Sequence, residues 1–275
     1  GLSEVAHGTI TALDLAADAA VVLARDGSAV GFGLAQVRPG DTTLLRASCD
    51  GGVHPDWRGR GIGTALLTWQ LDRARSLAAE RRAALGSPVP AQAQGVVQEA
   101  AASTARLAER LGLSPARWFT TMARPLDVSV PEAPVPDGLR LEPWRPELDD
   151  AVRLAHNEAF TGHWAFQPWA PETWQQWQSG HRSFRPDWSW GALDGAGQVA
   201  GYALSAAYEQ DWAAQGRTEG WTSKLGVRSA WRGRGLAKAL LARSMRSFAD
   251  SGMQSAGLDV DTENVSGAMA LYEGL

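Results

Sequence analysis

Residues 53–67 read VHPDWRGRGIGTALL, and residues 227–241 read VRSAWRGRGLAKALL. Nine of the 15 aligned positions are identical, and the two copies lie 174 residues apart (227 − 53). A segment that recurs at this distance indicates two copies of one domain in tandem. The apolar residues after each copy recur with a period near 3.6, which predicts a helix that starts inside the segment. Gly86 and Gly252 are placed to end these two helices in a left-handed conformation.

The glycine-rich part of each copy suits a phosphate group. It reads Arg-x-x-Gly-x-Gly over residues 58–63 and Arg-x-x-Gly-x-Ala over residues 232–237. At a helix start the backbone N–H groups lack partners and carry a partial positive charge. Small residues leave room for a phosphate against these groups, and arginines add charge and hydrogen-bond donors. We therefore expect a phosphate-bearing cofactor in each half.

Two common phosphate motifs do not match. A P-loop requires Gly-Lys followed by Ser or Thr, and Ile62 and Leu236 break that pattern. A dinucleotide-binding turn needs a third glycine, where this chain has Thr64 and Lys238.

The halves share a further plan of strands and helices. β-rich runs on both sides of Asp26-Gly27 and of Asp194-Gly195 predict one hairpin in each half. Residues 254–260 predict a strand, and the residues from Asn264 onward predict another helix. The order of hairpin, strand, glycine-rich turn, helix, strand and helix predicts an α/β (α+β) fold for both domains.

A proline-rich stretch divides the chain. Residues 125–138 contain four prolines and no apolar periodicity, which predicts an extended linker. The predicted N-terminal domain therefore covers residues 1–126, the linker 127–138 and the C-terminal domain 139–275. The first copy continues into a predicted final strand at residues 118–122, whereas the second stops at residue 275. We expect the first domain to lack its start and the second domain to lack its final strand.

Composition excludes several classes of protein. A net charge of −4 argues against a nucleic-acid-binding surface, and no apolar stretch approaches the ~20 residues of a membrane helix. Cys49 is the only cysteine, which excludes an internal disulfide and a metal site built from cysteines. We expect a cytoplasmic protein that binds neither nucleic acid nor membrane and holds no metal. Cys49 lies in a predicted strand without a histidine pattern, so we expect a buried small residue rather than a nucleophile.

The sequence resembles the GNAT superfamily of acyl-CoA N-acyltransferases, in its tandem two-domain form. The family's phosphate motif, (Gln/Arg)-x-x-Gly-x-(Gly/Ala), matches both segments, and its late motif matches Asn264, Ala268 and residues 271–273. The resemblance implies two mixed, twisted sheets flanked by helices, each with two parallel strands that splay apart around pantetheine. It implies acetyl-CoA, or another short acyl-CoA, as the cofactor. The residues expected to bind it are Gly52, Val53, Arg58, Gly59, Arg60, Gly61, Ile62, Gly63, Leu225, Gly226, Val227, Arg232, Gly233, Arg234, Gly235, Leu236, Ala237 and Asn264.

The resemblance also implies direct transfer, in which a neutral amine attacks the thioester and coenzyme A leaves as a thiolate. Tyr272 matches the family's tyrosine acid, whereas Ala108 stands at the aligned position of the first half. We therefore expect chemistry in the second domain, with coenzyme A binding retained and chemistry lost or altered in the first. Glu219 is the candidate general base, with Glu209 and Asp211 as alternatives.

Tryptophan is concentrated in the second half, which contains ten of the 13. Residues 160–174 are rich in aromatic residues and form the candidate site for a small-molecule amine acceptor, although core packing is expected for most individual rings. His156 and His163 are further candidate bases in this region. A non-catalytic acyl-CoA-binding protein and a protein N-acetyltransferase remain open as alternatives, and the sequence does not indicate an oligomeric state.

Overall fold

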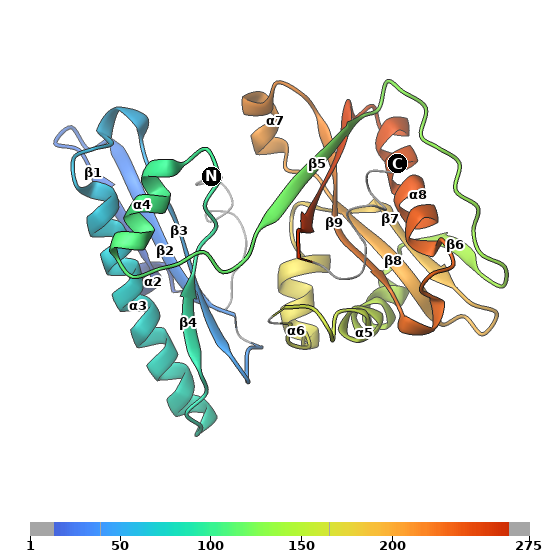
Figure 1. Cartoon of the computed structure of the whole chain (residues 1–275), viewed down its shortest axis with the longest axis horizontal. Helices are drawn as coiled ribbons and strands as arrows, with labels where there is room; N and C mark the ends of the chain where they lie inside the picture. Colours follow the sequence, from blue (N-terminus) through green and yellow to red (C-terminus); the bar gives the residue numbers. More distant parts are fainter. Residues whose placement is uncertain (1–13, 39, 165, 264–275) are drawn as a thin grey trace. The chain divides into compact units, whose positions relative to one another are not determined.

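The computed structural model describes residues 14–38, 40–164 and 166–263. These residues form two compact units that divide between Ala116 and Arg117. Each unit holds one mixed sheet with helices, of four strands in the first unit and six in the second (Figure 1). The α/β class and the two-domain plan predicted from the repeat are confirmed.

The first unit is built on a sheet with the strand order β1-β2-β3-β4. Its neighbouring strands are antiparallel except for β3 and β4, which are parallel. Helix α3 packs along β2 and β3 through a buried face that includes Leu66, Leu71 and Ala74. In chain order the elements are α2 (Leu15–Asp18), β1 (Ala19–Leu23), β2 (Ala29–Val37), β3 (Leu45–Val53), the 3₁₀ turn η1 (Pro55–Trp57), α3 (Ile62–Leu85), β4 (Ala91–Gln94) and α4 (Ala102–Arg110).

The second unit has the strand order β5-β10-β9-β8-β7-β6, in which only β9 and β10 are parallel. In chain order the elements are β5 (Phe119–Pro125), β6 (Arg140–Pro143), η2 (Pro146–Leu148), α5 (Asp149–Ala159), α6 (Pro171–Trp174), the π-helical turn η3 (Gln175–Ser179), β7 (Phe184–Leu193), β8 (Val199–Ala206), α7 (Glu209–Gln215), β9 (Glu219–Val227), η4 (Ser229–Trp231), α8 (Leu236–Asp250) and β10 (Ser255–Asp261).

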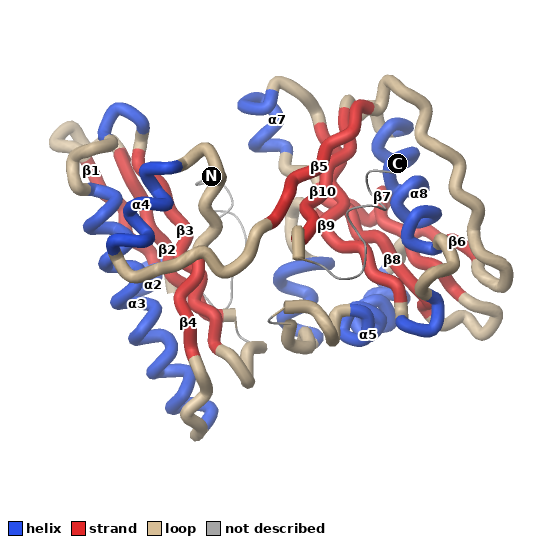
Figure 2. Tube along the Cα trace, viewed as in Figure 1, coloured by secondary structure: helices blue, strands red, loops and turns tan. Residues whose placement is uncertain are grey.

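Helices cover both faces of the second sheet. Along β8, Tyr202 and Leu204 pack with α5 and α6, whereas Ala203 between them packs with Leu236 and Leu240 of α8. Because side chains alternate along a strand, α8 lies on one face, and α5 with α6 lies on the other. Figure 2 shows α8 and α5 on different sides of these strands. We call the second side the α5 face.

The hairpins and helix ends predicted from the sequence are confirmed. The Asp-Gly turns lie between β1 and β2 and between β7 and β8. Gly86 caps α3 with a φ of 60°, and Gly252 follows α8 with a φ of 78°. Within the described ranges, none of the helices combines the length and apolar character that crossing a membrane requires.

Strand β5 corrects the predicted end of the first domain. Residues 119–125 pair in antiparallel register with β10, from Phe119 opposite Asp261 to Pro125 opposite Ser255. In Figure 1 the green arrow of β5 accordingly lies with the strands of the second unit. The prediction that this strand closes the first sheet is wrong, because strand propensity is local whereas the choice of a pairing partner is not. β5 is the outer neighbour of β10, at the place where the repeat predicts a missing strand.

The proline-rich segment is not the connection between the units. Residues 127–138 belong to the second unit, where Val130 packs against the cluster under α8 and Pro131 accepts a hydrogen bond from Arg246 at 3.0 Å. The segment contains no helix or strand, as its prolines predict. The unit division at Ala116 therefore lies before the predicted boundary at residue 126, because β5 pairs with β10.

Candidate active site

Both Arg-Gly-Arg-Gly segments fold into the same turn. Gly59 and Gly233 have φ values of 74° and 73°, and Gly61 and Gly235 both have a φ of 83°. Most side chains are strained in this region, so the turn favours glycine, and Asn and Asp are among the few other residues that tolerate it. Gly61 and Gly235 are the N-cap residues of α3 and α8 and have no side chain to cap the first helical N–H groups. An anion can bind at each of these helix starts instead.

The first arginine of each turn braces it. The Arg58 Nε donates to the carbonyl oxygen of Val53 at 3.3 Å, and the Arg232 Nε donates to that of Val227 at 3.1 Å. Each bond ties the turn to the last residue of the preceding strand. These two guanidinium groups therefore hold the shape of the turn.

The second arginine of each turn lies on a tryptophan ring. The guanidinium carbon of Arg60 is 4.6 Å from the ring centroid of Trp57, and that of Arg234 is 4.9 Å from the centroid of Trp231. Both arginines are exposed. A cation over an aromatic face is held by the ring quadrupole without losing its charge. These arginines are therefore oriented cations beside the helix starts.

Each sheet opens where its parallel strands separate. The ladder between β3 and β4 ends at Ser48 opposite Gln94, although β3 continues to Val53. The ladder between β9 and β10 ends at Trp221 opposite Gly257, although β9 continues to Val227. These openings have the form of the splay implied by the resemblance. The strand ends that border them contain Gly52, Val53, Leu225, Gly226 and Val227, while Ile62, Gly63, Leu236 and Ala237 begin the following helices.

A buried aromatic side chain leaves room only for glycine at position 226. A Cβ at this position would lie 2.5 Å from the hydroxyl oxygen of Tyr202, so only glycine fits. Tyr202 is fully buried on the α5 face, and its hydroxyl lies 2.6 Å from the Nδ1 of His156. Burial raises the pKa of Tyr202 well above its usual value. His156 and Tyr202 therefore form a buried pair behind the strand end, which the sequence did not indicate.

Strand β9 carries a bulge at Ser223. Leu204 of β8 pairs with Lys224 and Ser205 pairs with Thr222, so Ser223 is the extra residue. The Ser223 hydroxyl donates to the carbonyl oxygen of Leu204 at 3.0 Å. A bulge disrupts the ladder locally and redirects the side chains beyond it.

The bulge changes which residues share a face. Gly220 lies against Phe248 of α8, and beyond the bulge Val227 also packs on the α8 side. Glu219, next to Gly220, lies on the α5 face. Glu219 and Val227 are eight residues apart, which in an unbroken strand would place them on the same face; the extra residue reverses the alternation and places them on opposite faces.

The first sheet has no bulge at the corresponding place. Leu34 pairs with Asp50 in unbroken register, and the buried amide of Gln70 donates to both of their carbonyl oxygens, at 2.9 and 2.7 Å. Gln70 extends from α3 and fills the space beside Gly33, where a Cβ would lie 3.2 Å from it. The two sheets therefore differ at this position, where β9 of the second sheet is bulged and β3 of the first is not.

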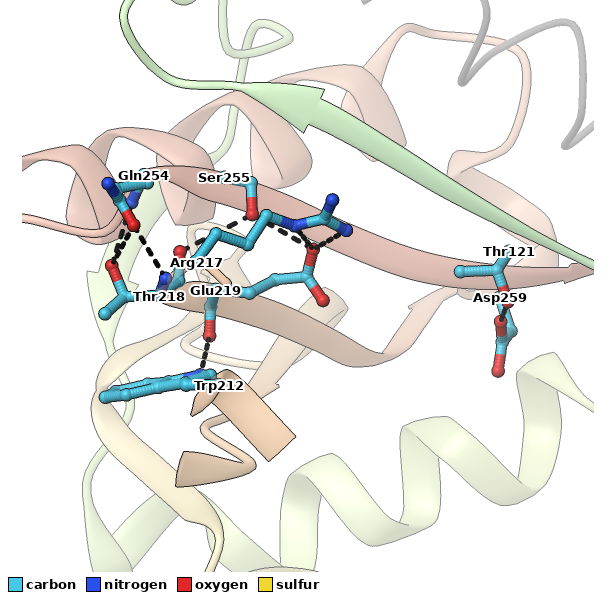
Figure 3. Close-up of polar contacts among 8 residues, drawn as sticks. All are labelled: Thr121, Trp212, Arg217, Thr218, Glu219, Gln254, Ser255 and Asp259. Atoms are coloured by element: carbon cyan, nitrogen blue, oxygen red, sulfur yellow. Dashed lines mark hydrogen bonds and ion pairs between the residues drawn. The ribbon is translucent and has the colours of Figure 1, made fainter. Parts of the chain in front are cut away.

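Glu219 is buried, with 5% of its surface exposed, at the closed end of the β9–β10 ladder. Its carboxylate pairs with Arg217 at 3.0 Å and accepts a hydrogen bond from the Ser255 hydroxyl at 3.0 Å. Figure 3 shows this arrangement, with the ring of Trp212 donating to the Glu219 carbonyl oxygen. Among the alternatives, Glu209 is ion-paired with Arg185, whereas Asp211 lines the same hollow as Glu219.

A hollow of about 260 Å³ lies on the α5 face, beside the point where β9 and β10 separate. The residues that line it come from α7, from the turn before it, and from β9 and β10. They are Tyr208, Asp211, Trp212, Gln215, Glu219, Trp221 and Asp259. Apart from Glu219 and Asp211, sequence reasoning did not place these residues in a site, because a hollow depends on tertiary packing.

The aromatic segment at residues 160–174 is largely core in the described positions. Trp174 is 1% exposed and packs with Val152 and Tyr202, and Trp169 packs against the same cluster. The Trp174 indole donates to Asp149 at 2.8 Å. Trp164, in contrast, is exposed. The expectation of core packing for most of these rings agrees with this arrangement.

Among the remaining candidates, those that the structure describes add no further catalytic arrangement. Burial lowers the pKa of His163, and the charges of Arg232 and Arg117 act in the same direction. Burial raises the pKa of the Cys49 thiol to about 11, and the charge of Asp50 raises it further, which argues against a nucleophile. Asn264 and Tyr272 lie outside the described residues. Within the described ranges, no three His, Cys, Asp or Glu side chains form a group that could hold a metal ion.

Comparison with known proteins decides the family. The model described as "Acetyltransferase (GNAT) family" matches residues 150–275, and the one described as "Acetyltransferase (GNAT) domain" matches residues 17–112. The mycothiol acetyltransferase of Salinispora tropica is 37% identical over 232 residues, which cover 81% of this chain and 67% of the relative. The chain belongs to the GNAT acetyltransferase family.

Other relatives agree with this assignment. The mycothiol acetyltransferase of a Nocardioides species is 30% identical over 81% of this GNAT chain and 74% of its own length. A GCN5-related N-acetyltransferase from Sphaerobacter thermophilus is 30% identical, with a TM-score of 0.70 over 95% of this chain and 77% of its own. The tandem GNAT protein of the clavulanic acid biosynthesis pathway, at 20% identity and a TM-score of 0.59, covers 93% of this chain and 79% of its own and shows the fold alone. The chain is thus an N-acetyltransferase with two GNAT domains in tandem.

Proposed function

We propose that the protein transfers an acetyl or other short acyl group from acyl-CoA to an amine of a small molecule, with the chemistry in the second domain. The observation that carries this assignment is the bulge at Ser223, located at the strand opening of the second sheet and next to the hollow. GNAT acetyltransferases use acetyl-CoA as acyl donor, which supports the choice of donor. The amine attacks the thioester carbon, the C–N bond forms, and the C–S bond breaks to release coenzyme A as a thiolate.

The residues proposed for the cofactor are those named from the sequence in both halves. Helix-start N–H groups of α3 and α8 would bind phosphate, with Arg60 and Arg234 as neighbouring cations. Leu225, Gly226 and Val227 would present backbone groups to pantetheine at the opening. Backbone N–H groups near the bulge would polarise the thioester carbonyl.

We propose that the first domain binds coenzyme A without catalysing the same transfer. The two turns have nearly the same backbone angles, which supports binding in both domains. Ala108 cannot donate a proton, and Gln70 occupies the carbonyl groups at the place that corresponds to the bulge. These differences support a division between a binding domain and a catalytic domain.

Proton transfer is proposed for two residues. Tyr272, named from the sequence motif, would protonate the leaving thiolate, and Tyr272→Phe should lower turnover with an amine acceptor by about 10²-fold or more. Glu219 would accept the proton of the amine through a water molecule, because its carboxylate lines the hollow and its own partners hold it in place. Undiminished turnover by Tyr272→Phe would contradict the asymmetry between the domains.

The acceptor is proposed to be a small molecule of the kind that mycothiol acetyltransferases, the relatives in the comparison, act on. The volume of the hollow is smaller than the ~300–1,000 Å³ of typical sites for drug-sized ligands, which favours a small group over a peptide. The test is acetyl transfer from acetyl-CoA, followed by mass spectrometry, to deacetylated mycothiol, a panel of primary amines and a peptide array. Transfer to small amines supports the proposal, whereas transfer only to peptides, or hydrolysis only, contradicts it.

A further inference from the structure

The hollow on the α5 face lies beside the opening between β9 and β10, where the proposed function places the thioester. Its floor includes Trp221, the last residue of β9 that pairs with β10, and Asp259, which follows that pair on β10. The separation of the strands therefore begins inside the hollow. A group bound there lies next to whatever occupies the opening, which links this site to the proposed transfer.

The lining of the hollow carries an excess of negative charge. Three acidic residues, Asp211, Glu219 and Asp259, line it, and none of its lining residues is Lys or Arg. Arg217 balances Glu219, whereas the described part of the chain offers no ion pair to Asp211 or Asp259. Two uncompensated carboxylates attract a cation and repel an anion.

The walls of the hollow are aromatic and held in place. Tyr208 and Trp221 meet edge to face, with ring centroids 6.3 Å apart. The indole N–H of Trp212 is occupied by the Glu219 carbonyl oxygen at 3.3 Å, which fixes that ring. Aromatic faces beside carboxylates bind ammonium groups, because the ring quadrupole and the negative charge act in the same direction.

Asp259 is oriented by a neighbouring strand. The hydroxyl of Thr121, its pairing partner on β5, donates to Asp259 Oδ1 at 2.6 Å. Figure 3 shows Thr121 and Asp259 to the right of the group around Glu219, with Asp259 on β10, the strand that pairs with β9. The second carboxylate oxygen remains for a ligand. A strand that precedes the second repeat in the sequence therefore helps to shape a site in the second domain.

We propose that this hollow is the acceptor subsite, that it takes the acceptor as an ammonium ion, and that Asp259 is the residue that anchors the ion. The proposal rests on the proposed function and adds the charge of the substrate and the residue that selects it. After docking, the ammonium loses one proton to a water molecule or to Glu219, and the neutral amine attacks the thioester. Thr121 acts as a positioning residue through Asp259.

The test compares matched variants of the full chain in steady-state acetyl transfer to the best amine of the panel. Asp259→Asn should raise the KM for the amine by at least about tenfold, with little change in the KM for acetyl-CoA. Thr121→Val, which keeps the shape and removes the donor, should raise the amine KM by a smaller factor. Asp250→Asn removes the same charge from an exposed position at the end of α8, on the other face, and should change neither KM.

A second measurement tests ligand binding in the hollow without acetyl transfer. Choline, a cation that carries no amine to acetylate, should bind wild-type protein in calorimetry and compete with the amine, whereas its uncharged carbon analogue 3,3-dimethylbutan-1-ol should bind at least about tenfold more weakly. Choline binding should be weakened in Asp259→Asn and retained in Asp250→Asn. Equal binding of choline and 3,3-dimethylbutan-1-ol, or the same amine KM in Asp259→Asn and Asp250→Asn, would overturn the acceptor subsite. Acetyl transfer by the wild type would still support the proposed function in that case. Absence of transfer to every amine would instead contradict the proposed function, and the acceptor role with it.

Discussion

Trp57 and Trp231 give the repeated turn a feature that its glycines do not explain. Each ring supports the arginine three residues later, and the arrangement occurs independently in both units. The first arginine of each turn donates to a strand carbonyl, whereas the second is exposed beside the helix start; the Arg60 guanidinium also donates to the carbonyl oxygen of Asp56 at 3.1 Å. At the scale of residues, the tryptophan prepares this cation for the cofactor.

Removal of one ring should weaken the binding of coenzyme A at that turn. A cation–π contact at an exposed site contributes about 0.5–1 kcal/mol, so Trp231→Ala should raise the Kd of the second site roughly two- to fivefold. Titration calorimetry with coenzyme A measures the change. Trp231→Phe keeps a ring under Arg234 and should restore most of the affinity, and an unchanged Kd in Trp231→Ala would contradict the role of the ring.

Cys49 provides a prediction about reactivity. A thiol pKa of about 11, compared with an ordinary value of 9.0, reduces the thiolate fraction near neutral pH by about 10²-fold. Alkylation of the native protein by iodoacetamide should therefore be about 10²-fold slower than that of the unfolded chain, and should accelerate as the pH rises toward 11. Cys49→Ala should keep full turnover, and loss of turnover would indicate a covalent acyl intermediate.

At the scale of elements, two similar strands follow different paths. β9 bulges at Ser223, whereas β3 stays in register and the Gln70 amide donates to the carbonyl groups of Leu34 and Asp50 at the corresponding place. One extra residue in β9 has a large effect, because a bulge moves every following side chain to the other face of the sheet. We infer that this difference separates the catalytic strand from the binding strand.

Gln70 should be important for the stability of the first unit. Gln70→Ala removes the donor to the carbonyl oxygens of Leu34 and Asp50, and a buried acceptor such as that of Leu34 costs about 1–3 kcal/mol when it loses its partner. The free energy of unfolding of the first unit should fall by at least that amount in urea denaturation followed by a probe in residues 14–116. Arg75→Ala, at an exposed position on the same helix, serves as the control, and equal stability of the two variants would contradict the role of Gln70.

The sequence predicted the elements better than it predicted their partners. The Asp-Gly hairpins, the helix starts at Gly61 and Gly235 and the helix ends near Gly86 and Gly252 follow from local backbone preferences, and they are confirmed. The bulge at Ser223 carries no local signal, because an extra residue shows only when both strands are aligned. The reversal of faces along β9 and the hollow beside Trp221 could not be predicted for the same reason.

At the scale of the whole molecule, the repeat in the sequence and the units in the structure do not coincide. Residues 119–125 align with the end of the first copy but form an edge strand of the second sheet, next to β10. Residues 127–138 also pack on the second unit. The second unit therefore includes residues 119–138, which lie before the second copy of the repeat in the sequence.

This arrangement predicts which amides unfold together. In hydrogen–deuterium exchange, amides of β5 bonded to β10 should exchange with the second unit, and should remain protected when Gln70→Ala destabilises the first. The control is β4, whose protection should fall in the same variant. Loss of protection in β5 together with β4 would contradict the assignment of the strand to the second sheet.

Acetyl transfer by matched variants of the two turns tests the division between binding and chemistry most directly. Gly59→Asp and Gly233→Asp place a carboxylate at equivalent sites, where φ is 74° and 73° and a Cβ meets no atom within 4 Å. Aspartate is among the residues that tolerate this conformation, and Gly59→Asn and Gly233→Asn control for the backbone change.

We predict that each Asp variant loses one of two bound coenzyme A molecules, counted by native mass spectrometry. Gly233→Asp should lower amine acetylation by about 10²-fold or more, since phosphate binding is opposed by like charge, whereas Gly59→Asp should keep most of it. Equal loss of acetylation in the two variants, or loss only in Gly59→Asp, would contradict catalysis by the second domain.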